Sequence, residues 1–270
     1  MRALLASPLG FLIGISLGAL GGGGSILAVP ALVYAAGQTP KHATTTSLVL
    51  VAVTAMIGII PHWRAGRVRL APGVIFGLAG VGGSLLGSHW NKAADPNVLL
   101  ILFSGLMLVA AYGMWRRVST TTAAAVPKSA GAAAAPIAPA APVRVDPMTI
   151  LKVIVAGTIV GLLTGFFGVG GGFVIVPALV LALGFSMPEA IGTSLLVITI
   201  NSMVALTTRL HAGSIEWGTV IPFTIASLIG VVVGSRLAST RDSSSLQRWF
   251  VGLLVVVAVY TAVRSGLALR

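Results

Sequence analysis

Two stretches of the chain share one pattern and decide its fold: GISLGALGGGGSILAVPALVYAAG at residues 14–37 and GLLTGFFGVGGGFVIVPALVLALG at residues 161–184. Pro30 and Pro177 lie in the same Val-Pro-Ala-Leu-Val context, so the stretches are offset by 177 − 30 = 147 residues. The same offset, without a gap, pairs residues from Gly14 (with Gly161) to Ser88 (with Ser235). We infer an internal duplication that gives the chain two structurally equivalent halves.

The composition around these stretches is that of a membrane protein. Of 270 residues, 56% are hydrophobic and 8% are charged, whereas a water-soluble domain carries about 25% charged residues. The net charge of +12 comes from Lys and Arg that lie between apolar stretches, as the positive-inside rule requires, and no continuous basic face predicts nucleic-acid binding. The chain has no Cys, which excludes disulfides and thiolate metal sites, and its His residues show no metal-ligand spacing.

Each half contains three apolar stretches long enough to cross a bilayer by the criterion of about 20 residues. In front of each trio is a pair of apolar stretches interrupted by glycines, and its second member is too short to span. We therefore predict a hairpin that enters the membrane, turns at the glycines and returns. The predicted spans are 43–61, 70–88, 96–114, 190–208, 217–235 and 246–263, and the predicted hairpin arms are 4–20 with 26–36 and 148–167 with 173–183.

Loop charges predict that the two halves are inverted relative to each other. The loop with Arg64, Arg67 and Arg69 is equivalent to one in which Arg209 is balanced by Glu216. The excess of positive charge is thus not shared by equivalent loops. Equivalent loops on opposite sides of the membrane, as in an inverted repeat, would show this difference. We expect the Arg64 loop on the cytoplasmic side and both termini outside.

The predicted fold is therefore an all-α polytopic membrane protein with two inverted repeats, each a glycine-broken helical hairpin plus three transmembrane helices. The repeats cover residues 1–118 and 148–270. Residues 119–147, rich in Ala, Pro, Thr and Ser, form a predicted low-complexity linker without functional residues.

The glycine clusters are the main candidate site. A helix start exposes about four unpaired N–H groups and roughly half a positive charge, and glycines let an anion approach that backbone. Two such starts, related by inversion, are expected to converge near the membrane midplane. The candidate residues are Gly21, Gly22, Gly23, Gly24 and Ser25 in the first half and Gly168, Gly170, Gly171 and Gly172 in the second. The alternative is that glycines only allow close helix packing, which we favour for the small-xxx-small pairs Gly14/Gly18, Gly83/Gly87 and Gly230/Gly234.

Hydroxyls at equivalent positions of the next spans are further candidates. Thr46-Ser47 and Thr193-Ser194 either bind oxyanion oxygens or bond back to their own helices, and the sequence leaves both open. Asn201, equivalent to Thr54, is a weaker candidate two turns further in.

Basic residues at span ends offer a weaker case. Arg64, Arg209 and His211, together with His62, either attract anions at an entrance or anchor the helix ends at the membrane interface.

The repeated glycine turn, the Val-Pro-Ala-Leu after it, the Thr-Ser-Leu and the Ala-Gly loop together resemble the TauE/SafE sulfite exporter family, also called the toluene sulfonate uptake permease family. The resemblance covers nearly everything outside the linker. It implies a multi-pass transporter of the plasma membrane for small sulfur-containing anions such as sulfite or organosulfonates. Carried over by motif position, it points to the same glycine turns and Thr-Ser pairs. The first half departs from the family pattern, with Gly-Gly-Gly-Gly-Ser at 21–25 where the second keeps Gly-Val-Gly-Gly-Gly at 168–172.

The sequence thus favours a transporter, an exporter or a permease, that holds a small anion at paired half-helix N-termini in the lipid bilayer. The alternative is a permease for another solute class, a metal cation or a neutral metabolite. An enzyme is not expected, because no Asp, Glu, Lys or Arg lies inside the predicted spans and no His lies there to activate a serine. We expect no cofactor, no bound metal and no nucleic-acid partner, and a homodimer is possible from symmetry alone.

Overall fold

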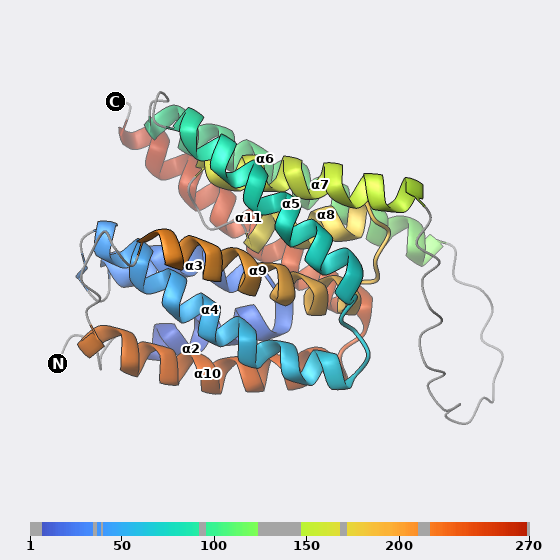
Figure 1. Cartoon of the computed structure of the whole chain (residues 1–270), viewed down its shortest axis with the longest axis horizontal. Coiled ribbons are helices and arrows are strands. Elements are labelled where there is room, and N and C mark those ends of the chain that lie inside the picture. The colour runs from blue at the N-terminus through green and yellow to red at the C-terminus, as the bar shows by residue number, and fades with distance from the viewer. Residues whose placement is uncertain are drawn as a thin grey trace.

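The computed structural model describes residues 7–34, 37–38, 40–91, 96–123, 147–167, 172–209 and 217–268. These residues form helices joined by short turns, and no strand occurs among them (Figure 1). The all-helical fold predicted from hydropathy is confirmed.

The helices of the described residues fall into two sets of five. The first half contains α2 (Ser7–Leu20), α3 (Gly23–Tyr34), α4 (Pro40–Arg64), α5 (Leu70–Asn91) and α6 (Pro96–Ala123). The second contains α7 (Pro147–Phe167), α8 (Gly172–Leu181), α9 (Met187–Arg209), α10 (Trp217–Thr240) and α11 (Ser243–Ala268). The last three helices of each set begin at residues separated by the sequence offset of 147, at 40 and 187, 70 and 217, and 96 and 243.

Six helices within the described residues are long and apolar enough to cross a membrane: they cover 45–64, 70–90, 147–167, 187–207, 220–240 and 243–263. The hairpin arms α3 and α8 have 12 and 10 residues, too short to span, as the sequence predicts. The partner arm α7 has 21 residues and is itself long enough to span. The second hairpin therefore combines one long and one short arm, whereas the described part of the first has arms of 14 and 12 residues.

The helices on either side of the linker extend into the predicted linker range, and the domain boundaries stay a prediction. Helix α6 continues to Ala123, past the expected linker start at Ser119, because neither Pro nor Gly interrupts the chain between Arg117 and Ala123. Helix α7 begins at Pro147, the last residue assigned to the linker, and Pro suits the first turn of a helix. The remaining linker residues, 124–146, lie outside the described part of the chain.

The two halves are held together by glycine-mediated helix packing. Helix α2 packs on α10, and the equivalent α7 packs on α5. A Cβ atom on Gly14 would overlap the backbone of Ser227, and one on Gly161 would overlap the backbone of Gly80. These two contacts are related by the 147-residue offset. The packing interpretation of the small-xxx-small pairs is confirmed, because Gly14, Gly18, Gly83, Gly87, Gly230 and Gly234 all lie against the backbone of a neighbouring helix.

Equivalent helices run in opposite directions at the centre of the molecule. In the contact between α4 and α9, Gly58 lies against Leu195 and His62 lies against Gly192, so residue numbers rise in one helix as they fall in the other. Because α9 is the counterpart of α4, this antiparallel contact is what an inverted repeat requires. The direction in which each half crosses a membrane stays a prediction.

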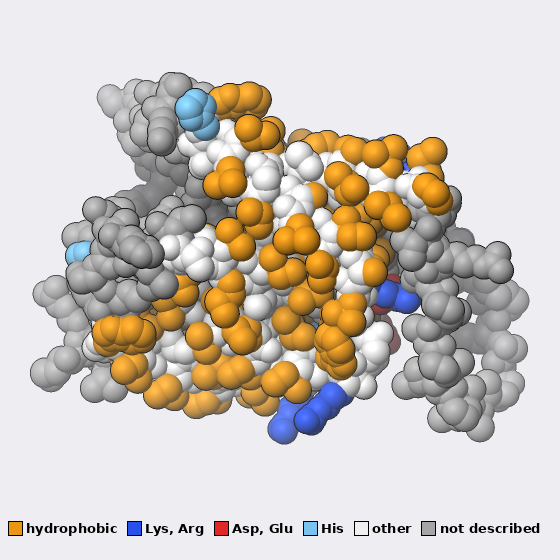
Figure 2. Space-filling model, viewed as in Figure 1, with side chains coloured by type: hydrophobic (Ala, Val, Ile, Leu, Met, Phe, Trp, Pro, Cys, Tyr) orange, Lys and Arg blue, Asp and Glu red, His pale blue; other side chains and the backbone are white. Residues whose placement is uncertain are grey.

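The surface is apolar over the face shown in Figure 2, where hydrophobic side chains predominate. Large side chains such as Leu85 and Val109 are 63% and 69% exposed, whereas Phe76 and Phe223 are fully buried. The Lys and Arg side chains visible on this face lie toward the edge where α4 and α10 end, away from the visible His side chains (Figures 1 and 2). A lipid-covered belt with cations gathered at one end fits a multi-pass membrane protein.

Candidate functional site

The first glycine turn breaks the hairpin between α2 and α3. Gly21 has a φ of 80°, in the left-handed region that favours glycine, and its N–H donates to the Leu17 carbonyl over 2.9 Å. The N–H of Gly22 donates to the Leu20 carbonyl over 3.0 Å, and α3 begins at Gly23. The glycines therefore end one helix and start the next within two residues.

The starts of α3 and α8 lie against each other. A Cβ atom on Gly22 would overlap the carbonyl oxygen of Gly172, the first residue of α8. A Cβ atom on Gly172 would in turn overlap the Ser25 hydroxyl and lie 3.0 Å from the Gly22 oxygen. Only glycine fits at Gly22, where the overlap is with backbone, whereas a Cβ atom at Gly172 would require the Ser25 hydroxyl to move. The structure thus brings together Gly22, Ser25 and Gly172 from the two predicted clusters, while Gly168, Gly170 and Gly171 lie outside the described residues.

Not every predicted glycine faces this junction. A Cβ atom on Gly24 would overlap the Ile13 carbonyl of α2, so Gly24 closes the hairpin upon itself. Gly23 is the first residue of α3. The junction is built by Gly21 and Gly22 rather than by the whole run of glycines.

The second half contributes its Thr-Ser pair to the same place. A Cβ atom on Gly21 would overlap the Ser194 hydroxyl and lie 3.0 Å from the Ile191 Cα atom. The Ser194 hydroxyl donates to the Ile191 carbonyl over 2.8 Å, and the Ser25 hydroxyl donates to the Gly22 carbonyl over 2.8 Å. For Ser194 this is a bond to its own helix, one of the two possibilities that the sequence leaves open, and the binding of an oxyanion stays a prediction.

Thr193 is bonded differently. Its hydroxyl oxygen accepts the backbone N–H of Arg69 over 3.1 Å, so it joins the second half to the loop before α5. The side chain is fully buried. Because the oxygen serves as the acceptor in this bond, the Thr193 hydroxyl keeps its own proton for donation.

Thr46 and Ser47 are buried on the first turns of α4. The offset pairs Ser47 with Ser194, and it pairs Gly21, the neighbour of Ser194, with Gly168. Gly168 lies outside the described residues. For the contact between Gly168 and Ser47 that the repeat predicts, the structure therefore describes only the α4 residues.

Asn201 lies between α9 and α5 rather than at the glycine junction. Its Nδ2 atom is 3.6 Å from the position a Cβ atom of Gly80 would take, and its Oδ1 atom is buried without a hydrogen-bond partner among the described residues. Its counterpart Thr54 donates to the Leu50 carbonyl over 2.6 Å and approaches the Ser227 hydroxyl at 3.2 Å. An amide oxygen accepts hydrogen bonds, so the orphaned atom of Asn201 does not favour an anion.

The predicted entrance residues are only partly described. Arg64 is exposed at the end of α4. Arg209 ends α9, and its side chain, like all of His211, lies outside the described residues. Their role at an entrance stays a prediction.

His62 lies in the last turn of α4, as the sequence places it, but its side chain is buried, and its role at an entrance stays a prediction. It was grouped with the residues of the span ends, yet only 2% of it is exposed. Its Nε2 atom lies 3.3 Å from the Gly18 carbonyl in the last turn of α2, and its Cβ atom is 3.2 Å from the Cβ position of Gly192. Position at the end of an apolar stretch could not show which side of α4 faces the protein.

A polar clasp joins the halves beside Thr193. The Nε atom of Arg69 donates to Glu189 Oε1 over 3.0 Å, and the other carboxylate oxygen accepts the N–H and hydroxyl of Ser186 over 3.1 and 2.9 Å. Glu189 thus caps the start of α9 by accepting the Ser186 N–H, which is one of the two bonds of a capping box. The pair of opposite charges leaves little net charge at this position.

The far ends of the short helices are capped away from the junction. Gly37 and Gly184 have φ values of 70° and 74°, and the next residues, Gln38 and Phe185, donate their N–H groups over 3.1 Å to the carbonyls of Leu32 and Leu179. Arg117 donates to the Val180 carbonyl, which places a cation at the negative end of the α8 dipole. The positive ends of α3 and α8 are left facing each other.

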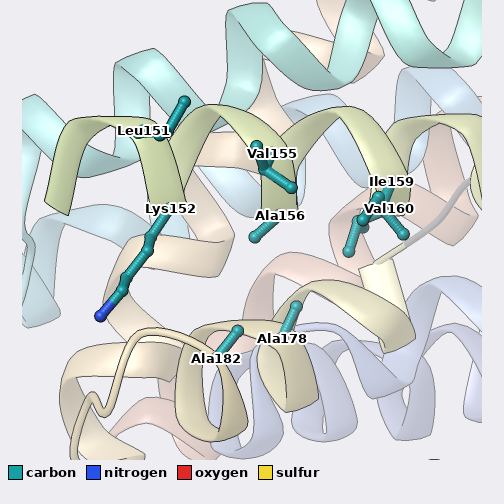
Figure 3. A pocket seen from close by; sticks show the side chains of 8 residues that line it. All are labelled: Leu151, Lys152, Val155, Ala156, Ile159, Val160, Ala178 and Ala182. Atoms are coloured by element: carbon teal, nitrogen blue, oxygen red, sulfur yellow. The ribbon is translucent and has the colours of Figure 1, made fainter. Parts of the chain in front are cut away.

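A separate groove opens between α7 and α8, with a volume of about 530 Å³ (Figure 3). Its lining is apolar except for Lys152, whose side chain points along α7 toward the end of α8. None of the predicted site residues lines it. The lining residues are Leu151, Lys152, Val155, Ala156, Ile159, Val160, Ala178 and Ala182.

Comparison with known proteins identifies the family. The family model described as sulfite exporter TauE/SafE matches residues 6–261. A probable membrane transporter protein of Xylella fastidiosa is 36% identical over 268 residues, covering 96% of this chain and 95% of its own length. The probable membrane transporter protein YunE of Bacillus subtilis is 24% identical and covers 95% of this chain and 92% of its own.

No solved structure matches the chain. The family match and the apolar helices agree with the multi-pass membrane protein expected from composition, and both point to transport rather than catalysis. The chain belongs to the TauE/SafE sulfite exporter family and is a membrane transporter.

Proposed function

We propose that the chain carries a small sulfur-containing anion, such as sulfite or an organosulfonate, and holds it at the facing starts of α3 and α8. The observation that carries the proposal is the junction of Gly22, Ser25 and Gly172, with Gly21 against Ser194. Two helix starts from different halves meet there without side chains that would shield their backbone.

The chemistry of this junction suits an anion. Unpaired N–H groups and the positive ends of two helix dipoles attract negative charge without a formal cation. The hydroxyl of Thr193 has a proton to donate. The hydroxyls of Ser25 and Ser194 now donate to local backbone carbonyls, and each could donate to an oxyanion instead. Arg117 at the opposite end of α8 stabilises the dipole in the same sense. Within the described part of the chain, a cation would find near the junction only the carboxylate of Glu189, which Arg69 already pairs.

The junction also suggests how access alternates. The two glycine backbones touch, so an anion enters only if α3 and α8 move apart. Rocking of the two equivalent halves about the antiparallel contact of α4 and α9 would separate the turns from one side and then from the other.

Flux measurements with the purified full chain in proteoliposomes test the proposal. We expect uptake of sulfite and of a short alkanesulfonate, and Ser194→Ala should raise the anion concentration needed for half-maximal uptake by about tenfold, because hydrogen bonds to charged groups contribute about 1.5–3 kcal/mol. Ser88→Ala is the matched control: its hydroxyl makes the same kind of local bond, to Leu85, on an exposed surface. Uptake of a metal cation or a neutral metabolite in place of anions would favour the alternative permease.

A further inference from the structure

His62 is a titratable side chain buried deep in the protein and not used by the proposed anion site. It lies on the last turns of α4, between the end of α2 and the start of α9. Gly18, which it contacts, is three residues before Gly21, and Gly192 directly precedes Thr193 and Ser194. His62 is therefore within one helical turn of both segments that form the junction.

The hydrogen bond to Gly18 fixes which ring nitrogen carries hydrogen. A carbonyl oxygen only accepts, so Nε2 must donate. In a regular helix the N–H of Gly22 would donate to the Gly18 carbonyl, but here it donates to the Leu20 carbonyl. The bond from His62 therefore gives the Gly18 carbonyl a donor. In the neutral ring Nδ1 is then an acceptor, and it is buried without a partner among the described residues. A protonated ring would point an N–H into the same place.

We propose that His62 is the proton-binding site of the transporter and that its imidazolium, with the Nδ1 hydrogen, binds together with the transported anion. The inference rests on the proposed function, because it needs an anion at the junction. One proton is taken up by Nδ1 as the anion binds and is released with it on the other side.

The charges around His62 explain why the two bind together. The described helix α2 has no ionisable side chain, and on α9 the acid Glu189 is held by Arg69. The loop after α4 adds Arg67, whose N–H donates to the His62 carbonyl over 2.9 Å, and α4 itself adds Arg64. The other groups on adjoining helices are Lys41, His42, Tyr34, Arg209 and Arg236.

None of these groups is an unpaired acid, so an imidazolium at this position has no counter-ion among the described residues. A charge buried without a partner is costly in an apolar medium. An arriving anion removes that cost, and the proton in turn strengthens anion binding by the same factor. The loaded protein would then carry a proton and a monoanion as a neutral pair.

The repeat supports the assignment independently. The 147-residue offset pairs His62 with Arg209, the last residue of α9. Both halves thus have a basic residue at this position, permanently charged in one and titratable in the other.

Proteoliposomes of the full chain test this proposal, with anion uptake and internal pH followed together under a clamped membrane potential. The wild type should co-transport protons, and its uptake should fall by about tenfold per pH unit above the titration range of His62. His62→Gln, which keeps a donor for Gly18, should move no protons and change uptake by less than about twofold over the same range. His89→Gln, an exposed histidine at the end of α5, should behave as the wild type.

The outcomes separate the two proposals. Anion uptake in which His62→Gln keeps the proton movement and the pH slope would overturn the role of His62 and leave the proposed function standing. A wild type that moves no anion overturns both. Should His62→Gln fail to reach the membrane, calorimetry of the wild type in buffers of different ionisation enthalpy decides the matter: uptake of one proton per bound anion supports the proposal, and uptake of none overturns it.

Discussion

The 147-residue repeat relates the glycine-packed helix pairs more closely than it relates the polar positions around α4 and α9. The contact of α2 with α10 is reproduced by α7 with α5, down to the glycines that lie against the facing backbone. The polar positions are reproduced only in part: Thr46-Ser47 recurs as Thr193-Ser194, but the offset pairs Thr54 with Asn201 and His62 with Arg209. The duplication conserves the scaffold, and the two halves differ where hydrogen bonds and charges act. This difference is consistent with the proposed site, which uses residues of α9 and the buried His62 of α4.

The strongest way to break this comparison is to show that equivalent loops lie on the same side of the membrane. With Cys introduced at Arg67 in one variant and at the equivalent Ser214 in another, we expect labelling by an impermeant thiol reagent from opposite sides, an all-or-none difference. The chain has no native Cys, so the cysteine-free parent is the control. Labelling of both positions from one side would contradict an inverted arrangement, despite the antiparallel contact of α4 and α9.

The packing part of the comparison predicts a large loss of stability. In Gly161→Ala the new Cβ atom would overlap the backbone of Gly80, and overpacking of this kind costs about 1–3 kcal/mol or more. Gly14→Ala, its repeat equivalent, should lose a similar amount. Thermal unfolding in detergent measures both, with Gly82→Ala as the control because nothing lies near that position. Equal midpoints for Gly161→Ala and Gly82→Ala would mean that the close approach of α5 and α7 is not required.

Sequence patterns predicted the scaffold better than the site, and for a physical reason. Hydropathy and the 147-residue offset depend on many residues, so the helices, the short hairpin arms and the glycine packing could all be derived. The direction of a single side chain depends on which face of its helix meets the protein. For this reason the sequence did not show that the His62 side chain is buried, nor that Gly24 packs within its own hairpin while Gly22 meets the other half. Bonds between distant segments, such as Arg69 to Thr193, leave no local signal.

The polar clasp between the halves predicts a smaller effect. Arg69 and Glu189 are 27% and 26% exposed, and pairs of this exposure contribute about 0–1 kcal/mol. A double-mutant cycle with Arg69→Gln and Glu189→Gln should give a coupling energy within that range and one that weakens with salt. A coupling energy well above it would show that the clasp, rather than glycine packing, holds the halves together.

The smallest effects come from the pair Thr54 and Asn201, and they sharpen the comparison most. Thr54 bonds to Leu50 and approaches Ser227, so Thr54→Val should cost about 0.6 kcal/mol, the average of hydrogen bonds measured between membrane helices. Asn201→Leu removes a buried oxygen that has no partner among the described residues, and we expect no loss of stability or a slight gain. Unfolding midpoints of the two variants measured side by side test this. Changes of opposite sign in the unfolding midpoint would show that the polar group of Thr54 stabilises the protein and that of Asn201 destabilises it. A loss at Asn201 as large as at Thr54 would instead mean that its amide oxygen has a partner in the membrane, such as a bound water.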